Sequence, residues 1–583
     1  MNKNKDLGID EVFALAVQNH QEKKFEAAQN FYNLTLKINP NHTAALNNLG
    51  VVLKALDQRE KAITCYEKAI VIDPNYSEAH NNLGTLLSDL KQYNKAISCY
   101  ERAIEIKPNY ADALSNLGVA YCELAQFQKA INYLEKAIKI KPGQSNAYFN
   151  IANVYLAVFD YQKAINFYKK TIEIDPNQAG ANNNLGVAFK HLGKQEKAVS
   201  AYKKAIEINP NFADAYNNLG VSYKELGEVQ KAVSSYEKAI KINPDFLSPR
   251  INLTGLYVGE LSDFEKAKNL SYEALKLKLM SDPVSNNIAL FKLKHDVQQA
   301  KYLSSKNYEV VGLDQFQKVG DEILNRKENK EDKNNYDKKI LLNSDEIDTI
   351  LPYHKSYHVY KPKIISGSCI NPDNNWLDVE EEYLNSADQI MYIDDFLSEE
   401  ALIELREFCL VSKVWNREYR NKYLGAFSDQ GFISPIHLQI AKDLKKELPK
   451  LFGPHKIEKF WGFKYDSTLG KGINIHADFA VHNLNFWITP DEYNNDKNSG
   501  GLKVYDVPAP DHWTFRDYNS NPDKVYKFLK DNNANCINVP YKFNRAVLFN
   551  SAYFHETDEI NFKDKYEGRR INCTYLFGRR VVK

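Results

Sequence analysis

Apolar and small residues recur with one spacing over the first 280 residues and with another in the last third of the chain. In the first part, Asn-Asn-Leu-Gly motifs recur with a period of 34 residues. The same period holds for a small residue at Gly50, Gly84, Gly118, Ala152, Gly186 and Gly220, for Ala62, Ala96, Ala130, Ala164, Ala198 and Ala232, and for Pro40, Pro74, Pro108, Pro142, Pro176, Pro210 and Pro244. Small residues let antiparallel helices approach closely, and proline ends the second helix of each unit. The pattern predicts stacked helix pairs over residues 9–280, with a partial first unit and a degenerate last unit at Phe246–Leu277.

The last third contains short apolar runs that are typical of strands. Gln389–Ile393, Leu484–Thr489 and Arg545–Asn550 are such runs, and the second is followed by Pro490. Ser398 stands where an N-cap would open a helix that continues to Phe408. We expect residues 386–583 to form one domain with its own core.

Residues 281–385 form a predicted connector between the two patterns. Ala289–Leu303 has a helical apolar stripe. His295 and Asp296 lie within it, and adjacent residues point about 100° apart on a helix, so we expect a capping or surface role for them. Arg326–Asn335 is a run of mixed charge that predicts a solvated linker.

Candidate chemistry concentrates in the last domain at His476, Asp478 and His555. On a strand, residues i and i+2 project from one face, so His476 and Asp478 can both reach one metal ion. His555 follows the predicted strand Arg545–Asn550. Two histidines and a carboxylate can occupy one face of Fe(II) and leave the opposite face open. His482 is the main rival as a third ligand.

These residues resemble the iron site of the Fe(II)/2-oxoglutarate-dependent oxygenases. The similar segments are Phe463–Asp466, Asn485–Trp487, Ser499–Leu502 and Asn544–Phe549, together with His476-Ala477-Asp478 and His555. The resemblance covers roughly the last third of the chain. It implies a double-stranded β-helix (jelly-roll) fold, Fe(II), 2-oxoglutarate and O₂. The implied reaction is hydroxylation of a C–H bond, or demethylation where that carbon is bound to nitrogen, with succinate and carbon dioxide as co-products.

A cation near the predicted metal could hold the far carboxylate of the co-substrate. Alternation places Arg570, Asn572 and Thr574 on one strand face, and the planar fork of an arginine matches a carboxylate. Arg570 is therefore the expected clamp, with Asn572 as its helper and Arg569 pointing to solvent. The sequence alone leaves the choice between Arg569 and Arg570 open. Resemblance to prolyl-hydroxylase-type sites suggests a co-substrate contact for Tyr465, although a tyrosine buried in the core fits the sequence equally well.

Two further comparisons limit the substrate. Nucleic-acid demethylases of the same superfamily share the strand Arg570–Thr574 but carry a second arginine six positions after the first, where this chain has Leu576. That subfamily is not supported. Asn485, Trp487 and Trp513 are candidate substrate contacts. The segment Tyr505–Val539 forms either a lid over the iron or a surface loop with a satellite core.

The repeats of the first part resemble tetratricopeptide repeats, which form curved solenoids that bind peptides or proteins. One asparagine recurs in register at Asn48, Asn82, Asn116, Asn150, Asn184, Asn218 and Asn252. This ladder resembles the asparagine ladder in the repeats of O-GlcNAc transferase. Each amide both donates and accepts, so the ladder could bind an extended peptide backbone. Alternatively, the amides satisfy neighbouring segments of the array.

Composition indicates which partners and which cellular compartment to expect. The formal net charge is +1, from 76 basic and 75 acidic residues, which removes the electrostatic case for a nucleic-acid or anionic-membrane partner. No apolar run of about 18 residues predicts a membrane span, and no signal peptide is visible. The seven cysteines include no C-x-x-C pair, so we expect a cytoplasmic protein, where reducing conditions help to maintain Fe(II).

Three functions compete. The first is a hydroxylase whose repeats recruit a protein or peptide substrate, because joining a binding array to an active site raises the local substrate concentration. The second is an oxygenase of small molecules with repeats that serve assembly. The third is a non-catalytic scaffold, against which the intact residues His476, Asp478, His555 and Arg570 argue.

Overall fold

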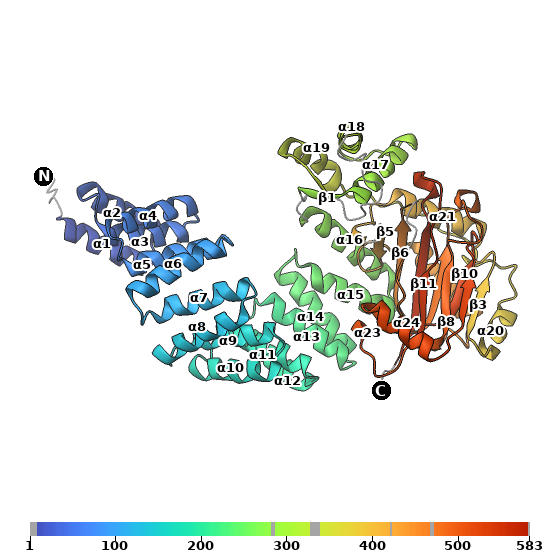
Figure 1. Cartoon of the computed structure of the whole chain (residues 1–583), viewed down its shortest axis with the longest axis horizontal. Coiled ribbons are helices and arrows are strands. Elements are labelled where there is room, and N and C mark those ends of the chain that lie inside the picture. Colours follow the sequence, from blue (N-terminus) through green and yellow to red (C-terminus); the bar gives the residue numbers. More distant parts are fainter. Residues whose placement is uncertain (1–7, 282–285, 327–338, 420–422, 467–471, 581–583) are drawn as a thin grey trace. The chain divides into compact units, whose positions relative to one another are not determined.

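The structure is a computed structural model that describes residues 8–281, 286–326, 339–419, 423–466 and 472–580 (Figure 1). The chain forms two compact units, residues 1–232 and 233–583. Of the predicted charged linker, all residues after Arg326 lie outside the described ranges. The division between the units falls inside the repeat array, because the last helix pair packs within the second unit.

The repeat array consists of consecutive antiparallel helix pairs. Its helices are α1 (Ile9–Gln21), α2 (Phe25–Ile38), α3 (Thr43–Ala55), α4 (Arg59–Ile72), α5 (Ser77–Asp89), α6 (Tyr93–Ile106), α7 (Ala111–Glu123), α8 (Phe127–Ile140), α9 (Ser145–Ala157), α10 (Tyr161–Ile174), α11 (Ala179–His191), α12 (Gln195–Ile208), α13 (Ala213–Glu225), α14 (Val229–Ile242), α15 (Leu247–Gly259) and α16 (Phe264–Ser281). The first repeat is a complete helix pair, α1 and α2, which corrects the expectation of a partial first repeat. No helix in the described part of the chain has both the length and the apolar character that crossing a bilayer requires.

The recurring small residue permits close contact between the two helices of a pair. A Cβ added at Gly50 would lie 2.5 Å from the Tyr66 ring, and one at Gly84 would lie 2.8 Å from the Tyr100 ring. Ala62 and Ala96 on the second helices are fully buried. The 34-residue pattern therefore reflects a steric requirement that repeats in each pair.

The degenerate last pair, α15 and α16, contacts the C-terminal sheet region directly. The Ser271 hydroxyl donates to the Ser428 carbonyl oxygen at 2.8 Å and accepts from the Gly431 amide at 2.7 Å. The Tyr272 hydroxyl donates to the carbonyl oxygen of Ile433 at 2.8 Å. This pair departs from the repeat motif and supports the second unit through these hydrogen bonds.

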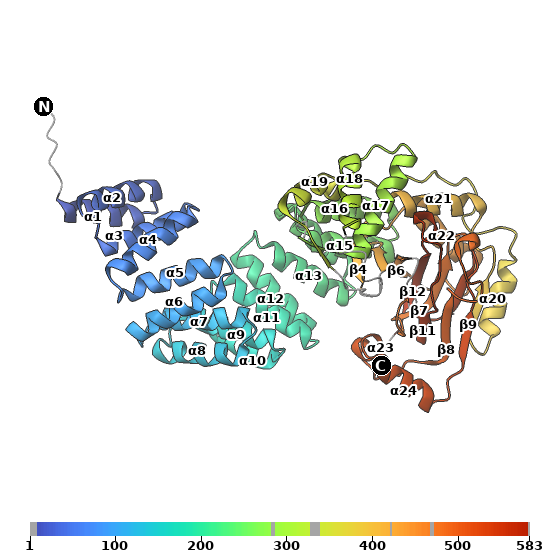
Figure 2. The same ribbon diagram turned by 45° about the horizontal axis from the view of Figure 1, so that its top comes forward.

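The connector adds helices α17 (Leu290–Ser305), α18 (Leu313–Leu324), α19 (Ser344–Lys355) and α20 (Trp376–Asn385), and a two-stranded sheet of β1 (Asn287–Ala289) and β2 (Lys339–Leu341). Figures 1 and 2 show α17, α18 and α19 together. Helix α17 confirms the predicted helical stripe. His295 and Asp296 are buried rather than at the surface: the His295 Nδ1 lies 2.9 Å from Asp296 Oδ1, and Lys292 pairs with the same carboxylate. The Tyr566 ring packs on the His295 ring with centroids 5.6 Å apart, a contact with a distant segment that helical spacing alone could not reveal.

Two antiparallel sheets dominate the rest of the second unit. The seven-stranded sheet has the order β3-β10-β7-β12-β6-β5-β4, and the three-stranded sheet has the order β11-β8-β9. The strands are β3 (Ile390–Ile393), β4 (Arg417–Tyr419), β5 (Tyr423–Phe427), β6 (Ile457–Tyr465), β7 (Ala480–Trp487), β8 (Leu502–Pro508), β9 (Cys536–Val539), β10 (Ala546–Asn550), β11 (Tyr553–Thr557) and β12 (Ile571–Arg579), with helices α21 (Glu399–Val411), α22 (Pro435–Glu447), α23 (Phe515–Asn519) and α24 (Pro522–Asp531) and short 3₁₀ turns η2 (Asp491–Tyr493) and η3 (Tyr566–Gly568). Ser398 precedes α21 as predicted, but its side chain makes no capping hydrogen bond.

The two sheets share an apolar core, and helices cover the outer face of the larger one. Tyr465 and Val547 from the larger sheet pack with Val504 and Val539 from the smaller sheet. On the outer face, the His437 ring of α22 stacks on Phe460 of β6 with ring centroids 5.3 Å apart. The sheets therefore hold one buried face of β6, β7 and β12 toward the candidate site.

We predict that the second unit loses stability as pH falls below about 6.5, because His437 is fully buried and burial lowers its pKa to about 3. The unfolded chain takes up a proton near pH 6.5 and the folded chain does not, so this group alone lowers the unfolding free energy by about 2 kcal/mol between pH 7 and pH 5. His437→Phe should reduce that dependence by about 2 kcal/mol in chemical denaturation at both pH values, while the other buried histidines keep their share. The same substitution at the exposed His512 should leave it unchanged, and an equal effect of the two variants would contradict the assignment.

Candidate metal centre

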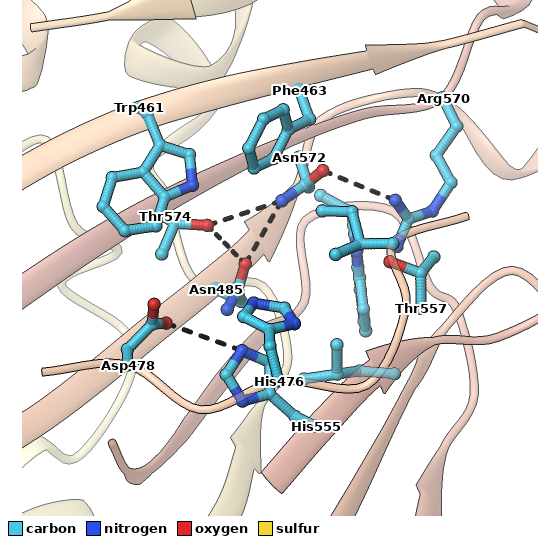
Figure 3. Close-up of a pocket in the computed structure, with 13 residues that line it drawn as sticks. Trp461, Phe463, His476, Asp478, Asn485, His555, Thr557, Arg570, Asn572 and Thr574 are labelled. Carbon is cyan, nitrogen blue, oxygen red and sulfur yellow. Dashed lines mark hydrogen bonds and ion pairs between the residues drawn. The ribbon is translucent and has the colours of Figure 1, made fainter. Parts of the chain in front are cut away.

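His476, Asp478 and His555 come together in one pocket between the sheets (Figure 3). Each offers a ligand atom, and these atoms lie within 4.8 Å of one another. The His555 Nε2 lies 3.5 Å from Asp478 Oδ2. Two backbone hydrogen bonds fix this arrangement: the His476 amide donates to the His555 carbonyl oxygen at 3.0 Å, and the His555 amide donates to that of His476 at 2.8 Å.

Strand alternation explains why the ligands face the pocket. Ile475 and Ala477 pack on the opposite side, in a satellite core with Phe554 and with residues of α24. His476, Asp478 and His555 therefore point inward together. The segment of His476 pairs with the strand of His555 through an isolated bridge between these two residues, and the Thr557 amide donates to the Ile473 carbonyl oxygen at 3.1 Å.

Both imidazole rings are oriented by their own strands. The His476 Nδ1 lies 2.8 Å from the Asn474 carbonyl oxygen, and the His555 Nδ1 lies 3.1 Å from the Tyr553 carbonyl oxygen. A carbonyl can only accept, so each Nδ1 carries the proton and each Nε2 keeps its lone pair. Metal-ligating histidines use this arrangement, in which the outer nitrogen donates and fixes the ring.

Burial disfavours charge at these groups. It raises the pKa of the Asp478 carboxyl, although His476 and the Asn483 amide act in the opposite direction. Burial and the neighbouring His476 lower the pKa of His555 well below its usual value. A divalent cation among the three would stabilise the ionised carboxylate and use the imidazole lone pairs. The residues present therefore fit a metal ion bound by two imidazoles and one carboxylate.

Arg570 lines the same pocket as a buried cation. Its Nε donates to the Gly500 carbonyl oxygen at 2.6 Å, and Nη2 donates to that of Gly501 at 3.3 Å. Its side chain is 1% exposed, and among the described residues no carboxylate lies within ion-pair distance of it. A buried charge of this kind is costly unless a counter-ion joins it.

Arg569 does not point to solvent, which corrects the sequence expectation. It is 2% exposed, donates to Gln298 of α17 at 2.9 Å and pairs with Asp466 at 3.3 Å. The connector helix therefore covers the side of the strand that was expected to be free. Only Arg570, of the two arginines, lines the pocket.

The other predicted co-substrate and substrate residues have different surroundings. Asn572 accepts from Arg570 Nη1 at 3.4 Å. The Tyr465 ring lies 4.8 Å below the Arg570 guanidinium but is not among the pocket-lining residues. Asn485 and Trp487 both line the pocket. The Asn485 oxygen is already engaged, since it accepts from Thr574 at 2.6 Å and from Asn572 at 3.2 Å.

Trp513 lies outside this pocket, which corrects its placement as a substrate contact there. Its ring packs on Phe528 and Phe554 with centroids 5.1 and 6.1 Å away. These rings belong to the satellite core behind the ligand strand. The segment Tyr505–Val539 was interpreted either as a lid over the iron or as a surface loop with a satellite core. The contacts of α24 agree with the satellite core.

His482, the rival ligand, lies apart from the metal-ligand group. It faces Phe452, His455 and Tyr383, and its Nδ1 is 3.4 Å from the Tyr383 hydroxyl. Burial lowers its pKa to about 4. Residue 482 has the opposite strand parity to Asn483 and Asn485, which places it on the other face of β7.

The pocket also contains residues that the sequence analysis did not single out as lining it. These are Trp461, Phe463, Ile473, Leu502, Thr557 and Thr574. Strand parity could have found some of them, because Thr557 is two positions after His555 and Thr574 two after Asn572. Asn483, fully buried, donates to Asp478 at 2.6 Å and was also missed.

The predicted asparagine ladder in the repeats is a chain of contacts between neighbouring pairs. Asn82 donates to Asn47 at 2.9 Å, and Asn218 donates to Asn183 at 3.0 Å. The corresponding bonds join Asn116 to Asn81, Asn150 to Ser115 and Asn184 to Asn153, while Asn48 accepts from Asn47, and Asn252 has interactions of its own. The ladder amides are half-buried, so they link the repeats along one face.

Comparison with known proteins identifies the repeats. Tetratricopeptide-repeat families match residues 41–109, 75–143, 145–178, 167–200 and 213–246, and a family described as TPR repeat matches 189–227. The N-terminal solenoid is thus a tetratricopeptide-repeat array, of a kind that mediates contacts between proteins. No curated protein matches the chain significantly.

Solved structures resemble the chain over part of its length. MamA is 26% identical over 28% of this chain and 95% of its own, with a TM-score of 0.26. YrrB, described as a repeat protein with an unusual peptide-binding site, is 24% identical over 32% of this chain and 95% of its own, with a TM-score of 0.27. A repeat protein from Parabacteroides merdae is 17% identical over 40% and 93%, with a TM-score of 0.35.

We predict that the native chain binds one Fe(II) under anaerobic conditions, and that His476→Ala, Asp478→Ala and His555→Ala each abolish binding, because each removes one of three converging ligands. Metal content after desalting measures the effect. His482→Ala is the matched control, since His482 is a histidine of the same domain outside the group. Loss of iron in that variant with retention in His555→Ala would show the ligand assignment to be wrong.

Proposed function

We propose that the C-terminal part of the chain is an Fe(II)- and 2-oxoglutarate-dependent oxygenase, specifically a hydroxylase. One observation carries the proposal: three inward-facing metal ligands share a pocket with a buried arginine that has no acidic partner there among the described residues. The ligands suit Fe(II), and the arginine suits the carboxylate of a co-substrate.

The strand order is consistent with a double-stranded β-helix. Strands β10, β7, β12 and β6 are adjacent in the larger sheet. The smaller sheet has β11, β8 and β9, and the segment at His476 adds to it beside β11 through its bridge to His555. Two facing sheets of four antiparallel strands are the basis of a jelly roll. We therefore propose this fold for the domain.

The surroundings of Arg570 suit a dicarboxylate. A guanidinium has five N–H donors. Three of them donate toward Gly500, Gly501 and Asn572, and no carboxylate pairs with the guanidinium among the described residues, so an anionic ligand would supply the missing counter-charge. The hydroxyl of Thr557 also lines this part of the pocket. Together these groups can fix one carboxylate of 2-oxoglutarate and leave its other end for the metal.

In this proposal the residues of the pocket have separate roles in binding the metal, the co-substrate and the substrate. Bound iron would supply the activation of O₂ and of the 2-oxo acid, giving succinate, carbon dioxide and a hydroxylated product. His476, Asp478 and His555 would bind the metal, and Arg570 would orient the co-substrate. Trp461 lies at the opposite end of the pocket from Arg570 in Figure 3, so its face is the proposed wall for the substrate C–H group.

The proposal also assigns a role to the repeat array. Tetratricopeptide repeats bind proteins or peptides, and we propose that this array recruits the protein or peptide to be hydroxylated in the cytoplasm. The alternative is a small-molecule oxygenase whose repeats serve assembly. The bonds between neighbouring ladder asparagines use part of the capacity of each amide, so a recruited peptide would bind the part that remains.

We predict that the iron-loaded chain converts 2-oxoglutarate slowly to succinate without added substrate, and that Arg570→Ala weakens 2-oxoglutarate binding by about 2–4 kcal/mol, because a buried charge-assisted contact is lost. Succinate release and the KM for 2-oxoglutarate measure both effects, and iron binding should change little. Absence of succinate from the iron-loaded native chain would contradict the proposed reaction.

Arg569→Lys is the control for Arg570→Ala. It keeps a positive charge beside the buried Asp466 and outside the pocket, so the KM for 2-oxoglutarate should stay near the native value. Arg569→Ala is less suitable, because it would remove the cation that pairs with Asp466 and so lower stability. An equal rise in KM for Arg569→Lys and Arg570→Ala would contradict the assignment of the clamp.

We predict that Asn116→Ala, Asn150→Ala and Asn184→Ala, combined in one chain, raise the KM for a protein substrate and leave basal succinate formation unchanged, because the array acts before the chemical step. The exposed Asn94 and Asn109, changed to Ala, are controls for surface polarity. Thermal unfolding of the array must be compared, since the ladder also links the repeats. An unchanged KM in a stably folded triple variant would favour the assembly role.

A further inference from the structure

A continuous line of side-chain hydrogen bonds joins the proposed co-substrate clamp to the proposed metal ligand. Arg570 Nη1 donates to Asn572 Oδ1 at 3.4 Å, and Asn572 Nδ2 donates to Asn485 Oδ1 at 3.2 Å. Asn485 Nδ2 then donates to Asn483 Oδ1 at 2.8 Å, and Asn483 Nδ2 donates to Asp478 Oδ2 at 2.6 Å. All five side chains are buried. We call this set the amide relay.

The two ends of the amide relay determine its direction. A guanidinium has donors and no acceptor, and an ionised carboxylate has acceptors and no donor. Each intervening amide must therefore accept through its oxygen and donate through its nitrogen in the same sense. The orientation of Asn572, Asn485 and Asn483 follows from this chemistry, although oxygen and nitrogen of an amide are similar in shape.

Strand register builds the amide relay. In the pairing of β12 with β7, Asn572 is opposite Trp487 and Thr574 is opposite Asn485. Asn483 and Asn485 are two residues apart on β7, so both point to the pocket face. Thr574 accepts from Asn572 Nδ2 at 3.4 Å and donates to the Asn485 oxygen at 2.6 Å, so it bridges these two residues in parallel with their direct hydrogen bond.

We propose that Asn483 and Asn485 are positioning residues that couple anion binding at Arg570 to metal binding at Asp478; this inference rests on the proposed function. Asn483 donates to Asp478 Oδ2, the oxygen that also lies 3.5 Å from His555 Nε2, so this bond acts on the carboxylate oxygen nearest the other ligand. An anion at Arg570 offsets the guanidinium charge, so Arg570 polarises the relay less. Asn483 then withdraws less charge from Asp478, which binds a cation more tightly. The longest bond of the relay is the one at Arg570, where the anion would act.

Coupling of this kind is reciprocal and measurable without turnover. Co(II) serves as the metal probe, because its visible absorption bands report the ligand geometry. Butyrate serves as the anion probe, because its single carboxylate can engage Arg570 while its other end is an unreactive methyl group. In the native chain, saturating butyrate should tighten Co(II) binding on the order of fivefold and shift the visible bands.

Two substitutions interrupt the amide relay at its centre. Asn485→Leu removes both amide functions, and Asn485→Asp keeps the shape and the acceptors but removes the donor to Asn483. In either variant the ratio of Co(II) affinities with and without butyrate should fall toward one. Thr574→Val is the matched control, since it removes a bond to the same oxygen without interrupting the relay, and it should keep the native ratio. If Asn485→Leu does not fold, Asn485→Asp provides the same measurement.

The outcomes separate this inference from the proposed function. If the native chain binds neither Co(II) nor Fe(II), the proposed function fails and the coupling fails with it. If it binds Co(II) and butyrate with no change in Co(II) affinity, the coupling alone is overturned. Native coupling in a folded Asn485→Asp variant also overturns it, because direct attraction between anion and cation would then account for the effect.

Discussion

The candidate site depends on one backbone pair, His476 opposite His555. Each of these residues donates its amide to the carbonyl of the other, at 3.0 and 2.8 Å. Side chains of such a directly opposed pair lie on the same face, and here the ring centroids are 4.2 Å apart. Alternation then brings Asp478 to the same face and sends Ala477 into the satellite core. A shift of one residue in this register would turn every ligand away from the pocket.

The site concentrates buried polar groups that a fold without a ligand would avoid. Arg570 is buried with carbonyl and amide partners, whereas Arg569, one residue away, has Asp466 as its counter-ion. The two arginines differ in whether a carboxylate pairs with them and not in burial, since both have nearly the same burial. Stabilisation of the site by a metal and a dicarboxylate would offset the desolvation of Asp478 and Arg570.

The repeat array depends on contacts that recur from one helix pair to the next. Several helix pairs repeat the same steric contact between a glycine and a side chain of the second helix, as at Gly50 and Tyr66 and at Gly186 and Tyr202. Asparagine bonds then connect one pair to the next. The last pair lacks the motif and instead bonds the second unit through Ser271. Loss of the repeat signature there marks a change of partner, from the next repeat to the sheet region.

The sequence by itself determined what depends on local periodicity. The 34-residue spacing set the helix pairs, and two-residue spacing placed His476 with Asp478 and Arg570 with Asn572 on common faces. Backbone geometry alone determines which of these residues share a face, so the same residues share a face in the folded chain. The full extent of the first helix pair was the exception, because its motif residues are incomplete.

Only the tertiary structure decided what covers each face. Arg569 was expected at the surface but is buried and bonds α17, and His295 and Asp296 of α17 are buried as well. Trp513 was expected at the substrate and packs behind the ligand strand. The direction of the amide relay also needed the register of β7 against β12. Each outcome depends on contacts between segments far apart in the chain, which local spacing does not encode.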